Sequence, residues 1–165
     1  MKKNLITLFA LLFVVPASYA QKKPASPRVT AESGNVSIDY GQPSKKGRDI
    51  FGKLVPFDKV WRAGANDGTE VTFKKDVNFS GKDIKAGTYT LFAIPGESEW
   101  TIILNPNLKQ WGAYGYKKIM KDDIASVKVK PMKTSDSVEA MTFDVSDNSI
   151  TLIWDDTKVS VPLKF

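Results

Sequence analysis

The amino-acid sequence predicts an all-β protein, a single-domain antiparallel β-sandwich of roughly nine or ten short strands. Apolar and polar residues alternate over short segments such as 36–40 and 127–130, as in strands with one buried face. Glycine, proline, asparagine and aspartate separate these segments at regular intervals, and no repeat or long helical pattern interrupts them. A jelly-roll or immunoglobulin-like arrangement fits this pattern. A β-barrel is the alternative, although a deep barrel needs more continuous hairpins than residues 105–123 allow.

The N-terminus has the pattern of a secretory signal peptide over residues 1–20. Two lysines precede an apolar run from Leu5 to Val15, and Ser18-Tyr19-Ala20 supplies the small residues of a cleavage site. The apolar run is too short to span a bilayer. We therefore expect cleavage after Ala20, a periplasmic or secreted protein, and no membrane span in the mature chain.

Two further regions follow the signal peptide. Residues 21–27 form a polar, proline-containing leader that we expect to be flexible, and residues 28–165 form the sandwich domain. Cleavage would remove two lysines and no acid, lowering a net charge that is already only +6. The remaining lysines are spread along the chain, so we predict no nucleic-acid partner.

The composition excludes several kinds of chemistry. The chain has no cysteine, which rules out a disulfide framework and thiol catalysis. It has no histidine either, which removes the commonest general base and most zinc or iron sites. We therefore predict no cofactor and no metal site.

The expected elements follow in chain order. Residues 36–40 form a strand, and Asp67-Gly68 is a hairpin turn that leads into a strand at 70–73. Residues 87–94 and 100–104 are the most apolar strands and are expected at the centre, buried on both faces. The remaining elements are a strand at 77–79 returning through Ile84, a long loop at 105–123 with a short helical turn from 117, an edge strand at 127–130, and a three-stranded meander at 138–145, 150–154 and 159–163.

The segment 47–66 is the first candidate site. Arg48 and Arg62 could grip a carboxylate, phosphate or sulfate in a fork geometry, with Asn66 adding an amide and Trp61 an apolar wall. Its glycines suggest tight turns or close backbone approach. In the alternative interpretation each arginine pairs with an internal acid (Asp39, Asp58, Glu70 or Glu139) and only holds a loop in place.

The second candidate site is the glycine-rich aromatic stretch in the long loop. Trp111, Tyr114 and Tyr116 could stack on a sugar ring or on a hydrophobic partner. Alternatively, these side chains fold back as a lid over the open end of the sandwich.

Several of these motifs together resemble a family of secreted bacterial proteins, the domain of unknown function 2911 family. The matching residues are Tyr40-Gly41-Gln42-Pro43-Ser44, Lys46-Gly47-Arg48, Ile50-Phe51-Gly52, Trp61-Arg62-Ala63-Gly64-Ala65-Asn66, Ala86-Gly87-Thr88-Tyr89 and Trp111-Gly112. The resemblance covers nearly all of the chain after the signal peptide. It implies an exported, single-domain β protein from a Gram-negative bacterium, and it implies no activity.

Three functions remain open from the sequence. The first is a non-catalytic binding or envelope-associated module that takes a small anionic or carbohydrate ligand. The second is a hydrolase or lyase acting on an acidic glycan, which would need an acid or tyrosine such as Asp58, Glu139 or Tyr40 beside the two arginines. The third is a purely structural envelope protein. No catalytic motif is complete, so we assign no catalytic residue.

Overall fold

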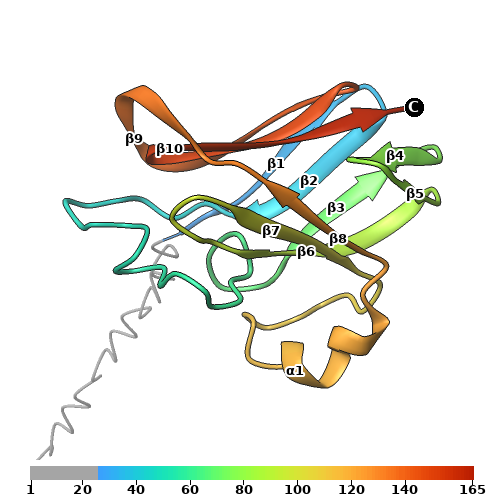
Figure 1. Ribbon diagram of the computed structural model, residues 1–165, viewed down its shortest axis with the longest axis horizontal. Coiled ribbons are helices and arrows are strands. Elements are labelled where there is room, and N and C mark those ends of the chain that lie inside the picture. The colour runs from blue at the N-terminus through green and yellow to red at the C-terminus, as the bar shows by residue number, and fades with distance from the viewer. Residues whose placement is uncertain (1–25) are drawn as a thin grey trace, which may run out of the picture.

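The computed structural model describes residues 26–165, and the predicted signal peptide and residues 21–25 of the leader lie outside this range. The described chain forms two antiparallel sheets that pack face to face (Figure 1). The strands are β1 (Arg28–Ser33), β2 (Val36–Gly41), β3 (Thr69–Phe73), β4 (Val77–Phe79), β5 (Lys82–Ile84), β6 (Gly87–Ile94), β7 (Trp100–Asn105), β8 (Ala125–Val129), β9 (Met132–Ser146) and β10 (Ser149–Lys164).

One sheet has six strands in the order β1-β2-β3-β6-β7-β8, and the other has four in the order β5-β4-β10-β9. Alternating residues of both sheets, among them Ile38, Leu104 and Leu152, are buried in one shared core. The all-β sandwich is therefore confirmed. The barrel alternative is wrong, because neither sheet closes on itself within the described residues.

Strands β6 and β7 are buried on both faces, as their continuous apolar runs predict. Leu91 and Leu104 face the main core, whereas Phe92 and Ile103 face the opposite way, where Tyr116 covers them. The covering segment contains a short helix, α1 (Tyr116–Ile119), and a single 3-10 turn at Met120–Asp122. The helical turn expected after residue 117 is thus present, and it seals the outer face of the central strands.

The prediction of a three-stranded C-terminal meander is wrong in its details, since two long strands replace the three short ones. The predicted turn at 155–157 is a bulge inside β10, with a positive φ of 53° at Asp155 and register shifts on either side. Burial resumes at Thr157 and Val159, so the strand continues beyond the bulge. The far end of β10 leaves β9 and pairs Leu163 with Phe79 of β4.

Two other elements differ from expectation. Strand β1 was not predicted, because its residues are only half-buried or exposed and give a weak apolar signal. Asp67-Gly68 precedes β3 but closes no hairpin, since the chain before it is a long loop from Gln42 to Gly68. Within this loop Trp61 pairs with Ala93 of β6 through two backbone hydrogen bonds, of 2.7 and 2.8 Å. Trp61 enters the core and Val60 packs against the outer cluster, as strand alternation predicts.

Candidate functional site

The two candidate segments meet in space. A backbone bridge pairs Asp67 with Trp111. Gly68 N donates to Gln110 O at 2.6 Å, and Gly112 N donates to Asn66 O at 3.1 Å. The turn that was expected to form a hairpin therefore joins the 47–66 segment to the aromatic loop, and it brings Tyr114 beside Arg62.

A cavity of about 390 Å³ lies at this junction, and we call it the basic cavity. Three cationic side chains line it and, among the described residues, no aspartate or glutamate does. Four of the seven sequence-predicted site residues take part, namely Arg48, Trp61, Arg62 and Tyr114. The full lining is Ser26, Pro43, Arg48, Leu54, Val55, Pro56, Lys59, Val60, Trp61, Arg62, Gly64, Ala65, Tyr114 and Trp154.

Arg62 is the most unusual residue of the basic cavity. Its Nε atom is buried and has no hydrogen-bond partner within residues 26–165. Buried polar atoms in folded proteins are nearly always paired, and a charged group left without a partner is costly. Arg62 is therefore a donor that the described part of the chain leaves unsatisfied.

Arg48 is held by the backbone and not by an acid. Its Nε donates to Lys45 O at 2.9 Å and its Nη2 donates to Ser44 O at 2.7 Å. These bonds fix the guanidinium without neutralising it. No ion pair of Arg48 or Arg62 with a carboxylate is found in residues 26–165.

The acids proposed as alternative partners are mostly engaged elsewhere. Asp39 pairs with Arg28 at 3.0 Å. Glu70 accepts from the backbone N of Lys109, and Glu139 accepts from the backbone N of Lys46. The interpretation in which Asp39, Glu70 or Glu139 neutralises the two arginines therefore does not describe this structure.

Trp61 forms an aromatic wall of the basic cavity. Its ring stacks on Trp154 with centroids 6.2 Å apart and planes 19° apart, and Phe51 and Trp100 pack edge-on against it. Its indole Nε1 donates to Gly64 O at 3.1 Å, so the ring orientation is fixed. Trp154 comes from β10. The sequence did not suggest it as a site residue, because its strand position indicates only a core aromatic side chain.

The other predicted site residues lie outside the cavity. Asn66 donates from Nδ2 to Ser26 O at 3.3 Å and holds the N-terminal segment. Trp111 is 65 % exposed and does not line the basic cavity. Tyr116 packs on Phe92 with centroids 5.0 Å apart and donates its hydroxyl to Asp123 at 2.6 Å. Burial, together with this hydrogen bond, raises the pKa of the Tyr116 hydroxyl well above its usual range.

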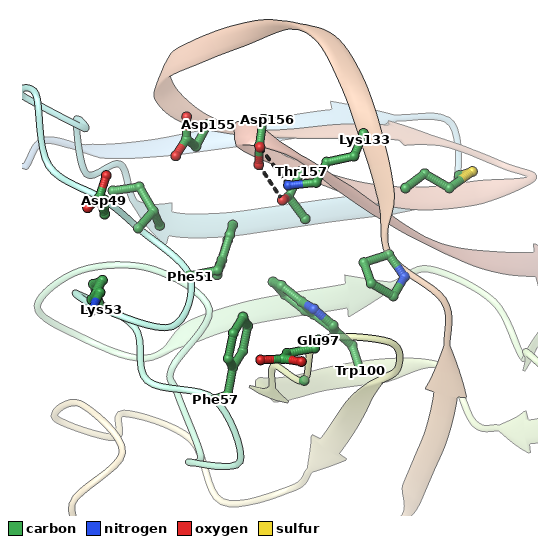
Figure 2. Close-up of a pocket in the computed structure, with 14 residues that line it drawn as sticks. Asp49, Phe51, Lys53, Phe57, Glu97, Trp100, Lys133, Asp155, Asp156 and Thr157 are labelled. Carbon is green, nitrogen blue, oxygen red and sulfur yellow. Dashed lines mark hydrogen bonds and ion pairs between the residues drawn. The ribbon is translucent and has the colours of Figure 1, made fainter.

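A second cavity, of about 520 Å³, opens on the other side of the 49–57 segment, and we call it the mixed cavity (Figure 2). Figure 2 shows Asp155, Asp156 and Lys133 at one end of the aromatic side chains, and Glu97 beside Phe57 and Trp100. Its acidic residues are Asp49, Glu97, Asp155 and Asp156, its lysines are Lys53 and Lys133, and its aromatic residues are Phe51, Phe57 and Trp100.

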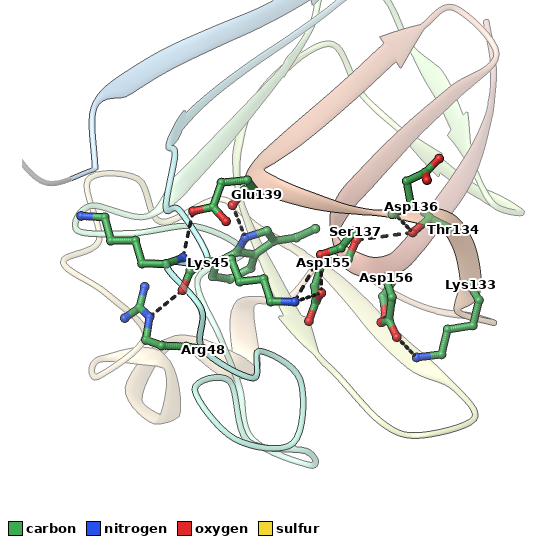
Figure 3. A network of polar contacts seen from close by, with 12 residues as sticks. Lys45, Arg48, Lys133, Thr134, Asp136, Ser137, Glu139, Asp155 and Asp156 are labelled. Carbon is green, nitrogen blue, oxygen red and sulfur yellow. Dashed lines mark hydrogen bonds and ion pairs between the residues drawn. The ribbon is translucent and has the colours of Figure 1, made fainter.

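Charges at the β10 side of the mixed cavity are paired internally (Figure 3). Lys45 binds Asp155, which also accepts from Ser137 at 2.8 Å, and Lys133 binds Asp156 at 2.6 Å. The hydrogen bond from Lys133 lowers the pKa of Asp156, and the hydrogen bond to Asp155 raises the pKa of Lys45. Residues 26–165 contain no group of three or more aspartate, glutamate, cysteine or histidine side chains suited to a metal ion.

Lys59, Leu54 and Pro43 were missed by sequence reasoning as cavity residues. Lys59 lies inside the 47–66 segment, and its charge could have been grouped with the two arginines. Pro43 and Leu54 carry no chemical signal of a site, and only the folding of the long loop brings them to the cavity.

A family model covers residues 22–163, almost the whole chain after the predicted signal peptide. The chain belongs to the DUF2911 family of proteins of unknown function. Comparisons with curated proteins and with solved structures each found no match. The DUF2911 match agrees with the resemblance carried by the Trp61 to Asn66 segment. Separately, no helix among residues 26–165 is long and apolar enough to cross a membrane.

Proposed function

We propose that this DUF2911 protein is an exported, non-catalytic binding protein that holds a small anionic ligand in the basic cavity. The observation that carries the proposal is the buried Nε of Arg62, which has no partner among the described residues. A carboxylate, phosphate or sulfate oxygen would satisfy it. The export step rests on the signal-peptide pattern of residues 1–20.

The charge of the cavity supports this ligand class. Arg48, Lys59 and Arg62 line it, and no carboxylate of the described chain opposes them there. Like charges around one cavity repel one another, and an anion relieves that repulsion on binding. Because the backbone already orients Arg48, its guanidinium loses little conformational entropy when it binds.

The apolar part of the lining limits the ligand further. Trp61, Trp154 and Leu54 offer ring and aliphatic surface beside the cations. A volume of about 390 Å³ falls in the usual range for small-molecule sites. We therefore favour an anion with a ring or hydrocarbon body, such as an acidic sugar or an aromatic or aliphatic organic acid, over a bare inorganic ion.

Binding without turnover is the simplest use of this geometry. None of the three groups considered as a catalytic acid or base, Asp58, Glu139 and Tyr40, lines the basic cavity. Tyr40 is buried, and its hydroxyl accepts from Phe143 N at 3.3 Å. An acidic-glycan hydrolase or lyase would need such a group beside the scissile bond.

A thermal-shift screen of the mature protein tests the proposal. The panel contains organic acids, sugar phosphates, uronic acids and sulfated oligosaccharides, each beside its neutral analogue. A ligand at ~100 times its Kd stabilises a protein by roughly 2.7 kcal/mol, which raises Tm by several degrees for a chain of this size. We expect a shift for an anion and none for its neutral analogue.

Variants then locate the binding site. Arg62→Met and Arg48→Met should each abolish the shift, and Lys82→Met, at an exposed position on β5, should leave it unchanged. A panel with no active anion, or a shift that survives both arginine substitutions, contradicts the proposal. Consumption of an active glycan would replace the binding function with an enzymatic one.

A further inference from the structure

The segment 108–124 exposes an unusual amount of apolar surface. It holds five of the eight large hydrophobic residues that are exposed among residues 26–165, namely Leu108, Trp111, Tyr114, Met120 and Ile124. Tyr114 is 84 % exposed, Trp111 65 % and Met120 53 %. Soluble proteins rarely gather large apolar side chains in one exposed region unless that region meets another surface.

One side of this segment is attached to the sheet and the other is free. Ala113, Tyr116 and Ile119 pack against the cluster formed by Phe92 and Ile103, on the outer face of β6 and β7. Trp111 and Met120, by contrast, are more than half exposed. Figure 1 shows α1 on the outer side of the six-stranded sheet, away from the four-stranded one. The exposed apolar residues are not needed to hold the segment in place.

In the same segment the lysines are free of ion pairs within residues 26–165, whereas the acids accept hydrogen bonds from neighbouring side chains. Its four lysines, Lys109, Lys117, Lys118 and Lys121, are exposed and form no ion pair with a residue of the described chain. Its two acids are held by neighbouring side chains. Asp122 accepts from Asn107 at 3.1 Å, and Asp123 accepts from Asn105 at 2.8 Å and from Tyr116. Asp122 is also exposed, but the four lysines outnumber the two acids, so the segment presents a net positive charge and apolar rings to solvent together.

We propose that this surface, which we call the Trp111 face, docks on an anionic lipid bilayer. It consists of Leu108, Lys109, Trp111, Lys117, Lys118, Met120 and Lys121. Tryptophan and lysine are typical of the membrane interface, where a ring or alkyl stem enters the headgroup layer and an ammonium group meets anionic headgroups. Charge complementarity favours this partner over a neutral protein surface. The docking is peripheral and independent of the basic cavity.

Vesicle co-sedimentation of the mature protein tests the proposal. One set of vesicles contains 30 % phosphatidylglycerol in phosphatidylcholine and the other contains phosphatidylcholine alone. We expect binding to the anionic vesicles that weakens at high salt. Since each lysine near an anionic surface contributes about fivefold to the partition constant, Lys117→Gln with Lys118→Gln should weaken binding about 25-fold. The matched control replaces two exposed lysines elsewhere, Lys75→Gln with Lys82→Gln, and should bind almost as wild type.

Tryptophan fluorescence gives a second readout. Of the four tryptophans, Trp61, Trp100 and Trp154 are buried, so a blue shift on vesicle binding reports Trp111. Trp111→Ala should remove the shift, and its folding is checked by circular dichroism.

Three results would overturn the docking: no preference for anionic vesicles, equal weakening by the two lysine pairs, or binding without a Trp111 signal. Loss of vesicle binding in Arg62→Met alone would also overturn it, because the headgroup would then occupy the basic cavity. If Arg62→Met binds vesicles normally, failure of the anion screen leaves the docking intact.

Discussion

The two cavities on either side of the 49–57 segment differ in how their charges are met. In the mixed cavity, Asp155 and Asp156 are paired with Lys45 and Lys133. In the basic cavity, the guanidinium groups of Arg48 and Arg62 meet no carboxylate of the described chain. Asp49, Glu97 and Lys53 add further charges of both signs to the mixed cavity, whereas the basic cavity gathers cations without a carboxylate from residues 26–165 and leaves them for a ligand. The basic cavity is therefore the better candidate site, although the mixed cavity has the larger volume.

Arg28 is an arginine whose guanidinium is paired with an acid and hydrogen-bonded to the backbone. It binds the Asp39 carboxylate at 3.0 Å and donates to Gly68 O at 3.0 Å and to Asp39 O at 3.1 Å. These contacts fix the turn that carries the backbone bridge to Trp111. Arg62 lies a few residues from the same turn and has no such role, which makes the two arginines a matched pair for mutation.

The largest expected effect concerns the aromatic wall of the basic cavity. Trp61→Ala removes a buried ring that stacks on Trp154 and packs against Phe51 and Trp100, and it should lower the free energy of unfolding by roughly 3–5 kcal/mol. Trp111→Ala removes an exposed ring and should cost less than about 0.5 kcal/mol. Urea unfolding followed by circular dichroism measures both. Similar losses for the two variants would mean that the wall is not part of the core.

The second prediction compares the two arginines directly. Arg28→Met loses an ion pair and three carbonyl contacts on a partly exposed side chain, and it should cost about 1–2 kcal/mol. Arg62→Met loses no hydrogen bond to the described chain and keeps the apolar stem, so stability should change by less than about 0.5 kcal/mol or rise. The same unfolding measurement applies. A large loss in Arg62→Met would show that Arg62 stabilises the fold, and the contrast between the cavities would fail.

The sequence predicted most of the sheet because the physical signal there is local. Alternation in residues 36–40 and 127–130 follows directly from one buried face, and the continuous apolar runs of β6 and β7 follow from two. A pair of aspartates followed by a threonine favours a turn as well as a bulge, so the local sequence at Asp155 predicts a turn. Only the cross-strand partners, with Thr157 and Val159 buried beyond it, show that the strand continues.

The candidate site could be predicted only in part. Charge and fork geometry single out Arg48 and Arg62 in the sequence, but which arginine an acid neutralises depends on contacts between distant segments. Asp39 pairs with Arg28, a partner that sequence reasoning did not consider. Likewise, the bridge between Asp67 and Trp111 joins residues far apart in the chain, and no local pattern announces it. The bridge holds the aromatic loop against the 47–66 segment, where Tyr114 lines the cavity, whereas Asn66 binds Ser26 O instead.

A third prediction tests the contact between the aromatic loop and Arg62. Gly112 and Gly47 have nearly equal positive φ values, 68° and 69°, so alanine at either position costs about 1–2 kcal/mol in backbone strain. A Cβ at Gly112 would also lie 2.9 Å from the Tyr114 ring and 3.3 Å from Arg62 Nη1, whereas nothing lies within 4 Å at Gly47. Tyr114 is exposed and can rotate away, so the extra cost in Gly112→Ala should stay within a few tenths of a kcal/mol.

The two glycine variants should differ more in ligand binding than in stability. Gly112→Ala should reduce the thermal shift given by an active anion, because Tyr114 leaves the cavity and the Arg62 guanidinium is crowded. Gly47→Ala should keep the shift. Equal shifts would place the ligand away from the aromatic loop and weaken the link between the two candidate segments.

The smallest expected effect is a pH dependence at Tyr116. Burial and the bond to Asp123 raise the pKa of this hydroxyl in the folded state above its unfolded value of about 10. This contribution to stability is therefore fully present below pH 10 and is lost as the pH rises above 10, where the unfolded state ionises and the folded state does not. Tyr116→Phe removes the titrating group, so it should flatten the alkaline decline while lowering stability at neutral pH through the lost hydrogen bond. Urea unfolding of both proteins between pH 8 and pH 11 measures the difference in slope. Parallel declines would mean that Tyr116 ionises as readily in the folded protein as in the unfolded chain, and that the segment covering β6 and β7 is more open to water than its packing on Phe92 indicates.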